Sequence, residues 1–201
     1  MSDDSTNGQA VDQNAVMGLF EDTGALLRGH FVLTSGLHSP NYLQCARVLQ
    51  FPNHSETLGR AIAEHFRDRR VSCVVAPALG GIVIGYEVAR SLGARSIFTE
   101  RDGNGEMTLR RGFSLDADER VLVVEDVITT GGSTRETIEA AISAGGKVIG
   151  AASVIDRSGG TADVGVPRFA LATLQVETYD PASCPLCAQG SKAVKPGSRR
   201  S

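Results

Sequence analysis

The sequence predicts an α/β fold, in which a doubly wound, mostly parallel five-stranded sheet is flanked by helices and carries a small N-terminal hood. Two observations predict this class. From residue 71 onward, short apolar runs alternate with helical stretches, which is typical of buried parallel strands joined by helical crossovers. Polar, glycine-containing segments follow three of these runs, and in such sheets ligands bind beyond the carboxyl ends of the strands. The pattern therefore predicts both the layers of the fold and the edge that carries the site.

The N-terminal part of the chain is expected to contain two helices and the hood. Residues 14–28 have the apolar spacing of a helix. Residues 29–50 are expected to form two short extended pieces, joined by a turn at the SG and SP dipeptides. Residues 53–69 form an amphipathic pattern that Asn53 or Ser55 can cap.

The core is expected in the rest of the chain. Apolar runs predict strands at residues 71–79, 94–101, 120–127, 147–157 and 168–174. Helices are expected over residues 80–93, ending at Gly93, and over residues 133–144, closed by a glycine pair. The polar segment 102–112 is long enough to be a mobile loop or a small hairpin.

The chain length suits a single domain, which is expected over residues 13–183. Within it, the hood covers about residues 13–50 and the core about residues 53–176. Residues 1–12 are expected to be disordered, and residues 184–201 to form an irregular tail.

Charge and hydropathy exclude several classes of function. The net charge is -3 and the sequence pI is about 5.8, so no basic excess indicates a nucleic-acid partner. No run of 18 apolar residues predicts a membrane span. The acidic, polar N-terminus does not have the pattern of a secretory signal, so a cytoplasmic protein is expected.

The cysteines do not indicate a disulfide scaffold, because there are only four in 201 residues. Cys73 lies in an apolar run and is expected to be a small core residue. Cys184 and Cys187 form a CPLC motif, which fits half a zinc site, a redox pair or two incidental thiols. The sequence shows no second ligand pair, which disfavours zinc within one chain but leaves open a site shared between subunits.

The segment 121–134, VLVVEDVITTGGST, carries the clearest chemistry. Its TTGGS run, at a strand-to-helix turn, offers backbone N–H groups, hydroxyls and a helix N-terminus to a phosphate. Glu125 and Asp126 just before it can accept hydrogen bonds from vicinal hydroxyls or hold Mg²⁺. An acidic pair followed by a phosphate loop suits a ribose 5-phosphate. Neither a Walker loop nor a dinucleotide-binding GxGxxG motif is present.

This segment resembles the signature of the type I phosphoribosyltransferases, in which phosphoribosyl pyrophosphate gives up pyrophosphate to a nitrogen base. By that resemblance, Asp126 is catalytic and Mg²⁺ is the cofactor, held mainly by the substrate and in part by Asp126. PALGG at residues 77–81 resembles the family's pyrophosphate loop, which implies a cis peptide at Ala78–Leu79. The resemblance assigns phosphoribosyl pyrophosphate binding to Glu125, Asp126, Val127, Ile128, Thr129, Thr130, Gly131, Gly132, Ser133, Leu79 and Gly80.

The hood indicates which base is used. FVLTSGLHSPNY at residues 31–42 resembles the F-x-L-K-S-G-x-x-S-P-x-[FY] motif of the orotate phosphoribosyltransferases. Arg157 also matches that family, and its guanidinium could pair with the orotate carboxylate. The resemblance implies that Thr129, Arg157, Thr34 and Tyr42 bind orotate.

The sequence departs from the family pattern at its basic positions. Thr34 stands where the family has lysine, and the segment 100–113 contains no lysine at all. We hypothesise that Arg101 and Arg110, with Arg111 beside them, replace the missing lysines as pyrophosphate clamps. Arginine binds phosphate well but does not donate a proton at neutral pH.

The expected function is transfer of the phosphoribosyl group to orotate, in de novo pyrimidine biosynthesis. By resemblance the protein is expected to be a homodimer, with no nucleic-acid or membrane partner. Two alternatives remain open: a phosphoribosyltransferase for another nucleobase, and a non-catalytic regulator that binds phosphoribosyl pyrophosphate.

Overall fold

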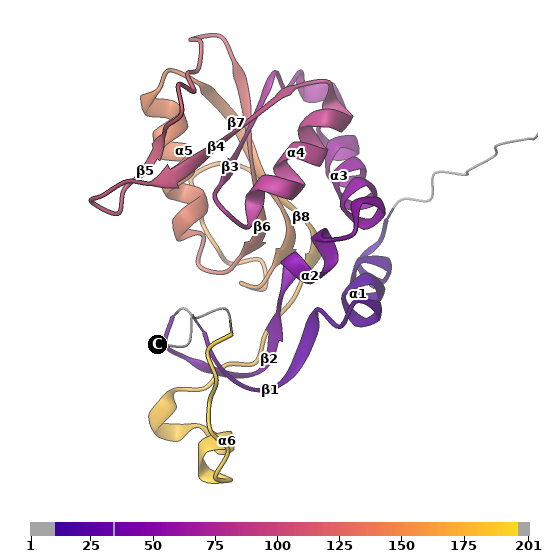
Figure 1. Cartoon of the computed structure of the whole chain (residues 1–201), viewed down its shortest axis with the longest axis vertical. Coiled ribbons are helices and arrows are strands. Elements are labelled where there is room, and N and C mark those ends of the chain that lie inside the picture. Colours follow the sequence, from indigo (N-terminus) through magenta and orange to yellow (C-terminus); the bar gives the residue numbers. More distant parts are fainter. Residues whose placement is uncertain (1–10, 34, 197–201) are drawn as a thin grey trace, which may run out of the picture.

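A six-stranded sheet forms the centre of the molecule (Figure 1). The structure is a computed structural model that describes residues 11–33 and 35–196. The strands of the sheet are β3 (Cys73–Pro77), β4 (Arg95–Arg101), β5 (Met107–Leu109), β6 (Arg120–Ile128), β7 (Lys147–Asp156) and β8 (Arg168–Thr173). Their order is β5-β4-β3-β6-β7-β8, and only β5 is antiparallel to its neighbour. The predicted doubly wound, mostly parallel class is confirmed, with one strand more than expected.

The sixth strand, β5, comes from the segment that the sequence left open between a loop and a hairpin. Met107–Leu109 pairs with the end of β4, and the turn between them is closed by the Asp102 carboxylate. Asp102 Oδ1 accepts hydrogen bonds from the backbone N–H groups of Asn104, at 2.8 Å, and Glu106, at 3.0 Å. The small hairpin is therefore the correct alternative.

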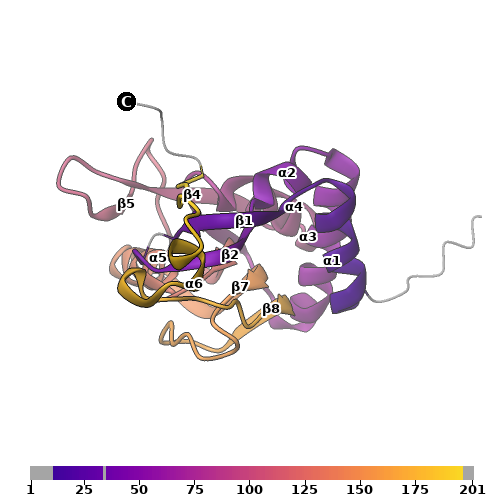
Figure 2. The same cartoon turned by 90° about the horizontal axis from the view of Figure 1, so that it is seen from below.

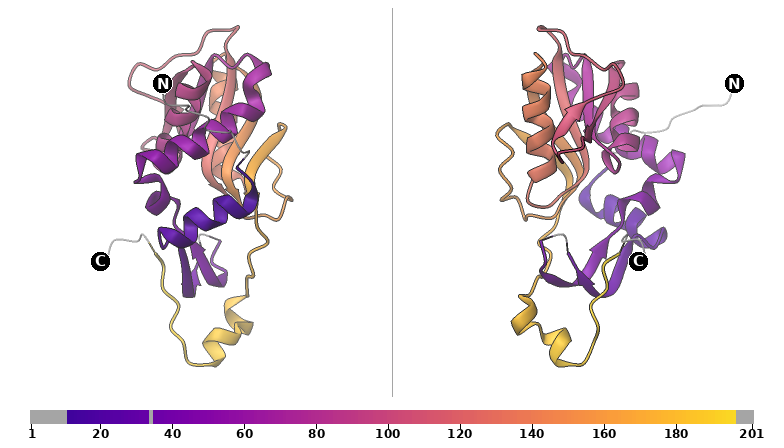
Figure 3. Two further views of the ribbon diagram at one scale, coloured as in Figure 1. Left: turned by 90° about the vertical axis from the view of Figure 1, so that its right-hand side faces the viewer. Right: turned by 60° about the vertical axis from the view of Figure 1, so that its left-hand side comes forward.

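The helices cover both faces of the sheet (Figure 3). The helices of the described residues are α1 (Gln13–Asp22), α2 (Cys45–Leu49), α3 (Pro52–Phe66), α4 (Gly81–Leu92), α5 (Gly132–Ser143) and α6 (Pro185–Ala188), with 3-10 turns η1 (Arg67–Arg69) and η2 (Pro181–Ser183). Helix α6 lies away from the sheet (Figure 1). Alternation along the strands divides the core, since Val74 and Leu122 pack with α3 and α4, whereas Val75 and Val123 pack with α5. These four side chains are fully buried.

Two helix ends differ from the expectations. The first helix ends at Asp22 rather than at residue 28, because Gly24 takes a left-handed φ of 62° and the chain enters the hood strand. Helix α3 begins after Phe51 with no side-chain cap, so neither Asn53 nor Ser55 caps it. The Ser55 hydroxyl instead donates to the Leu49 carbonyl at 2.9 Å. The predicted stop of α4 at Gly93, with φ 67°, is confirmed.

The hood is the antiparallel hairpin of β1 (Leu26–Val32) and β2 (His38–Leu43), as the sequence predicts. It lies beyond α2 at the lower end of the sheet in Figure 1, with the C-terminal tail and α6 beneath it. Figure 2 views the same hairpin from below, with α6 against it. The tail forms one bridge to each strand of the hairpin, Val194 to Phe31 and Tyr179 to His38.

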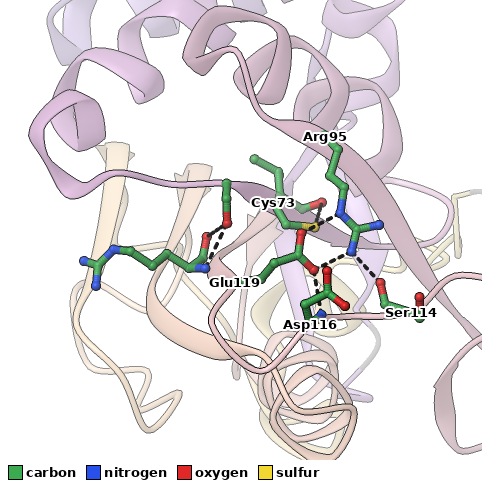
Figure 4. A network of polar contacts seen from close by, with 8 residues as sticks. Cys73, Arg95, Ser114, Asp116 and Glu119 are labelled. Carbon is green, nitrogen blue, oxygen red and sulfur yellow. Dashed lines mark hydrogen bonds and ion pairs between the residues drawn. The ribbon is translucent and has the colours of Figure 1, made fainter.

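The other end of the sheet is closed by a polar network near the start of the strands (Figure 4). The Arg95 guanidinium donates twice to the Glu119 carboxylate, at 2.6 and 2.5 Å, and also contacts the Ser114 carbonyl. Glu119 in turn accepts from the Asp116 backbone N–H at 2.9 Å. This network joins β4 to the loop before β6. Because parallel strands carry ligands at their carboxyl ends, its contribution is expected to be to stability.

Within the described parts of the chain, no helix combines the length and the apolar character that crossing a membrane requires.

Candidate active site

A cleft of about 480 Å³ opens where the strand order reverses, between the carboxyl ends of β3 and β6. Residues 125–134 line it along the end of β6, the following turn and the start of α5. The hood contributes Leu33, Ser35 and Tyr42. Gly80 after β3 and Arg157 after β7 also line the cleft, and these two strands lie on either side of β6. The sequence-predicted segments therefore converge on one space.

The turn from β6 into α5 has the form of a phosphate loop. Gly131 takes a left-handed φ of 79° and precedes the first residue of α5. A Cβ at Gly131 would also lie 2.7 Å from Val164 Cγ1, so only glycine fits there. No side chain caps α5. The first backbone N–H groups of α5, from Gly132 onward, lack helical partners and are available to an anion in the cleft.

The acidic pair at the end of β6 lies in the same cleft, and its two carboxyl groups differ in environment. The Glu125 side chain is buried, and burial together with the neighbouring Asp126 raises the pKa of its carboxyl group well above the ordinary value. Asp126 is more open, and its Oδ1 accepts the Val127 backbone N–H at 2.9 Å. A hydroxyl-bearing ligand would meet Asp126 as the more accessible acceptor.

Gly80 brings the turn before α4 close to Asp126. A Cβ added at Gly80 would lie 2.7–2.9 Å from the carboxyl atoms of Asp126, so the glycine leaves the space in front of that carboxylate open. The cis peptide expected at Ala78–Leu79 is present. The Leu79 side chain is 83% exposed and is not part of the cleft wall.

Arg157, at the end of β7, supplies the positive charge of the cleft. Its backbone N–H donates to the Ile128 carbonyl at 2.8 Å, which fixes its position beside the phosphate loop. Burial lowers the pKa of the guanidinium. Among the described residues its buried Nε has no hydrogen-bond acceptor. A half-buried arginine with an unpaired donor is suited to binding an anionic group.

Cys45 is a cleft residue that the sequence did not single out. Its thiol donates to the Asp126 carbonyl at 3.8 Å, linking α2 of the hood side to β6. Burial, with smaller contributions from Asp126 and Glu125, raises the pKa of this thiol well above its ordinary value, so it remains protonated. Cys45 follows the hood motif by three residues, which was the one feature of the sequence that could have indicated a place in the site. A cysteine at the start of a helix has no distinctive pattern, so the sequence did not identify it.

Comparison with known proteins identifies the family. The model of the phosphoribosyl transferase domain matches residues 45–175. The orotate phosphoribosyltransferase of Desulforamulus reducens is 56% identical over 190 residues, which cover 94% of this chain and 99% of that one. The orotate phosphoribosyltransferase of Pelotomaculum thermopropionicum is also 56% identical over 190 residues, covering 94% and 100%. This chain belongs to the orotate phosphoribosyltransferase family.

Solved structures agree with that family assignment. The crystal structure of the orotate phosphoribosyltransferase from Aeropyrum pernix superimposes with a TM-score of 0.68 at 28% identity, covering 80% of this chain and 94% of that one. A second orotate phosphoribosyltransferase structure, from Mycobacterium tuberculosis in complex with 5-phospho-α-D-ribosyl 1-diphosphate, has a TM-score of 0.62 at 27% identity and covers 79% and 96%.

The arginines that we expect to replace the family's lysines lie outside this cleft. Arg101 forms an ion pair with Glu136 at 2.7 Å and donates to the Gly105 carbonyl at 2.5 Å. Arg110 is exposed just beyond β5, and neither arginine lines the chain's own phosphoribosyltransferase cleft. Arg111 is engaged with Glu100 at 2.7 Å. Thr34, the other departure from the family pattern, lies outside the described residues.

Proposed function

We propose that this chain transfers the phosphoribosyl group of phosphoribosyl pyrophosphate to orotate, giving orotidine 5-phosphate and pyrophosphate in de novo pyrimidine biosynthesis. The observation that carries the proposal is the unpaired Arg157, which lies in one cleft with an acidic pair and a phosphate loop. The family's named activity requires a sugar-phosphate site and an anionic-base site together, and the presence of these groups in one cleft supports the proposal.

Phosphoribosyl pyrophosphate, the donor of the phosphoribosyl group, is bound at its 5-phosphate end. The 5-phosphate accepts hydrogen bonds from backbone N–H groups of residues 130–133, at the positive end of α5. Asp126, with Glu125 behind it, accepts from the ribose hydroxyls. The turn that contains Gly80 approaches Asp126 closely enough to contact the pyrophosphate attached at the reacting carbon.

Orotate is placed by its carboxylate. Arg157 pairs with that group through its guanidinium, and Tyr42 and Thr129 lie along the same cleft to contact the ring. Thr34 is assigned to the base by the family resemblance alone. In the reaction, the ring nitrogen forms the bond to the anomeric carbon as the bond to pyrophosphate breaks, and the nitrogen loses its proton.

Magnesium fits the donor set of this site. Phosphoribosyltransferases generally use Mg²⁺ with phosphoribosyl pyrophosphate, and the Asp126 carboxylate is the kind of oxygen ligand that Mg²⁺ takes. A Cβ at residue 80 would crowd this carboxylate, and Gly80 avoids that contact. When bound, the ion neutralises charge on the departing pyrophosphate. The Asp126 carboxylate stabilises the positive charge that develops on the ribose, because it is positioned before the reaction begins.

A homodimer in the cytoplasm is part of the same proposal. Arg101 and Arg110 lie on the β4–β5 hairpin, away from their own cleft, so their role as clamps requires that the hairpin reach the partner subunit's site. Mixing Arg157→Gln subunits with Arg101→Ala/Arg110→Ala subunits should give more activity than either impaired variant alone if the hairpin acts across the dimer. No recovery in mixed dimers, whose formation is confirmed by mass, would reject that arrangement.

The assigned reaction is tested by turnover with Mg²⁺, phosphoribosyl pyrophosphate and each of orotate, uracil, adenine and xanthine. Of the four bases, we expect only orotate to cause release of pyrophosphate. Release with a different base would establish the alternative transferase, and binding of phosphoribosyl pyrophosphate without release for any base would establish the regulator.

A further inference from the structure

Four metal-ligating side chains from the two ends of the chain meet beneath the hood. They are His30 and His38 of the β1–β2 hairpin and Cys184 and Cys187 of the CPLC motif, and their ligand atoms all lie within 4.8 Å of one another. We propose that this chain binds one Zn²⁺ through these four side chains, and that the ion fastens the C-terminal tail to the hood. The second ligand pair that the sequence did not reveal is the histidine pair.

Three nitrogen–sulfur distances in the cluster are close to the edges of a zinc tetrahedron. Cys184 Sγ lies 3.5 Å and Cys187 Sγ 3.8 Å from His30 Nε2, and Cys187 Sγ lies 3.4 Å from His38 Nδ1. Zn–N bonds of about 2.05 Å and Zn–S bonds of about 2.3 Å give a nitrogen–sulfur edge of about 3.5 Å. The two imidazole nitrogens are 2.9 Å apart and need to separate by a few tenths of an ångström, roughly, to admit the ion.

The histidine tautomer is already set for metal binding. His30 Nδ1 lies 3.0 Å from the Ser191 carbonyl oxygen, which can only accept a hydrogen bond, so Nδ1 carries the proton. In the neutral ring, Nε2 then presents its lone pair to the cluster. A carbonyl that fixes the non-ligating nitrogen in this way is the usual outer contact of a zinc-bound histidine.

Hydrogen bonds alone do not account for the cluster. His38 Nδ1, Cys184 Sγ and Cys187 Sγ all approach His30 Nε2 within 3.8 Å, and its one lone pair cannot accept from three donors. One cation at the centre would satisfy all four atoms. Two thiolates would balance the charge of Zn²⁺, which suits a cluster whose His30 and Cys184 are buried.

The site holds together segments that have few other contacts. Apart from the cluster, the tail is joined to the hairpin by two isolated bridges, Val194 to Phe31 and Tyr179 to His38, and by side-chain hydrogen bonds such as that of the Ser39 hydroxyl to the Glu177 carbonyl at 2.8 Å. Four protein ligands leave no open position, so the ion is structural. Because Leu33 and Tyr42 of the same hairpin line the active-site cleft, the ion would also steady that wall.

The direct test is elemental analysis of untagged protein, purified without chelator from zinc-sufficient medium. We expect about one zinc per chain, the occupancy of a closed four-ligand site. We expect the Cys184→Ser/Cys187→Ser and His30→Ala/His38→Ala variants to lose it, and His54→Ala, a histidine change on α3, to retain it. Zinc retained in both double variants, or stoichiometric iron instead, would overturn the proposal.

Wild-type protein gives an answer even where a variant fails to fold. Replacing the metal with Co²⁺ should produce the visible bands of a tetrahedral site with thiolate charge transfer. Chelation should lower Tm and let Cys187, the one exposed cysteine among the described residues, react faster with a thiol reagent, because its sulfur is no longer bound to the metal. Added zinc should reverse both effects. A metal-free protein with a Cys184–Cys187 disulfide, or with unchanged Tm on adding zinc, would refute the site.

Discussion

Replacing Arg157 by glutamine tests the base site most directly. The change removes the positive charge and the guanidinium fork and leaves a neutral, shorter polar side chain. In the free protein the guanidinium is half-buried, burial lowers its pKa, and its Nε lacks an acceptor among the described residues. The cost of desolvating the guanidinium is therefore already present before orotate binds. We expect the ion pair between Arg157 and the orotate carboxylate to contribute nearly all of its interaction energy to binding.

Losing one partner of such a desolvated charge pair costs about 2–4 kcal/mol, which corresponds to roughly a 30- to 1,000-fold fall in kcat/KM for orotate. We expect KM for phosphoribosyl pyrophosphate to stay within about threefold, because the phosphate loop is unchanged. For Arg157→Lys we expect a kcat/KM for orotate between those of the wild type and Arg157→Gln, since lysine keeps the charge but loses the guanidinium fork.

Steady-state kinetics with each substrate varied in turn measure these effects. Arg60→Gln is the matched control, because Arg60 is an exposed arginine of α3 outside the cleft. Kinetics for Arg157→Gln that match those of Arg60→Gln would show that Arg157 does not bind the base. An equal loss of affinity for both substrates would show that the change disturbs the cleft as a whole.

Three further predictions address the donor site, pH and stability. Gly80→Ala should reduce kcat/KM for phosphoribosyl pyrophosphate about tenfold or more at unchanged Tm, because the new Cβ would lie 2.7 Å from Asp126 Oδ1; unaltered kinetics would contradict this contact. Burial opposes ionisation of Asp156, but hydrogen bonds and the ion pair with Arg168 keep the pKa of Asp156 below its ordinary value. Its stabilising effect is complete above the unfolded-state pKa of about 3.9 and is lost as the pH falls through the lower folded-state pKa. Urea titrations should therefore show Asp156→Asn about 3 kcal/mol less stable at neutral pH, with the deficit shrinking in acid; a deficit constant with pH would exclude the ion pair as its cause. Arg95→Ala should lower Tm by about 2–4 °C and leave kcat unchanged, since the pair it breaks is partly exposed and lies at the opposite end of the sheet, whereas a kinetic defect would refute that separation.

The elements with strong local signals were predictable. The apolar runs gave the strands of the parallel core, and Gly93 gave the end of α4, because both depend on residues adjacent in sequence. The first helix was predicted too long, since Leu26 and Leu27 continue its apolar spacing while the conformation at Gly24 ends it. Tertiary pairing with β2 overrides periodicity at that point.

The site divides in the same way. The phosphate loop and the acidic pair are contiguous, so the sequence alone locates them together in the cleft. The proposed role of Arg101 and Arg110 in a partner subunit's cleft depends on the assembly, and no spacing in one chain encodes it. The histidine–cysteine cluster was missed because its histidines are 149 to 157 residues from the cysteines that they contact, a separation that no zinc-binding spacing covers.

The pairing of the tail with the hairpin also has a consequence for biosynthesis. His38 leaves the ribosome 149 residues before Cys187, which at about 5–20 residues per second is a delay of roughly 7–30 s. During that time the α/β core can fold while the hairpin still lacks its contacts with the tail. The contacts between the hairpin and the tail are thus formed late, because they require Cys184, Cys187 and Val194 to have been synthesised.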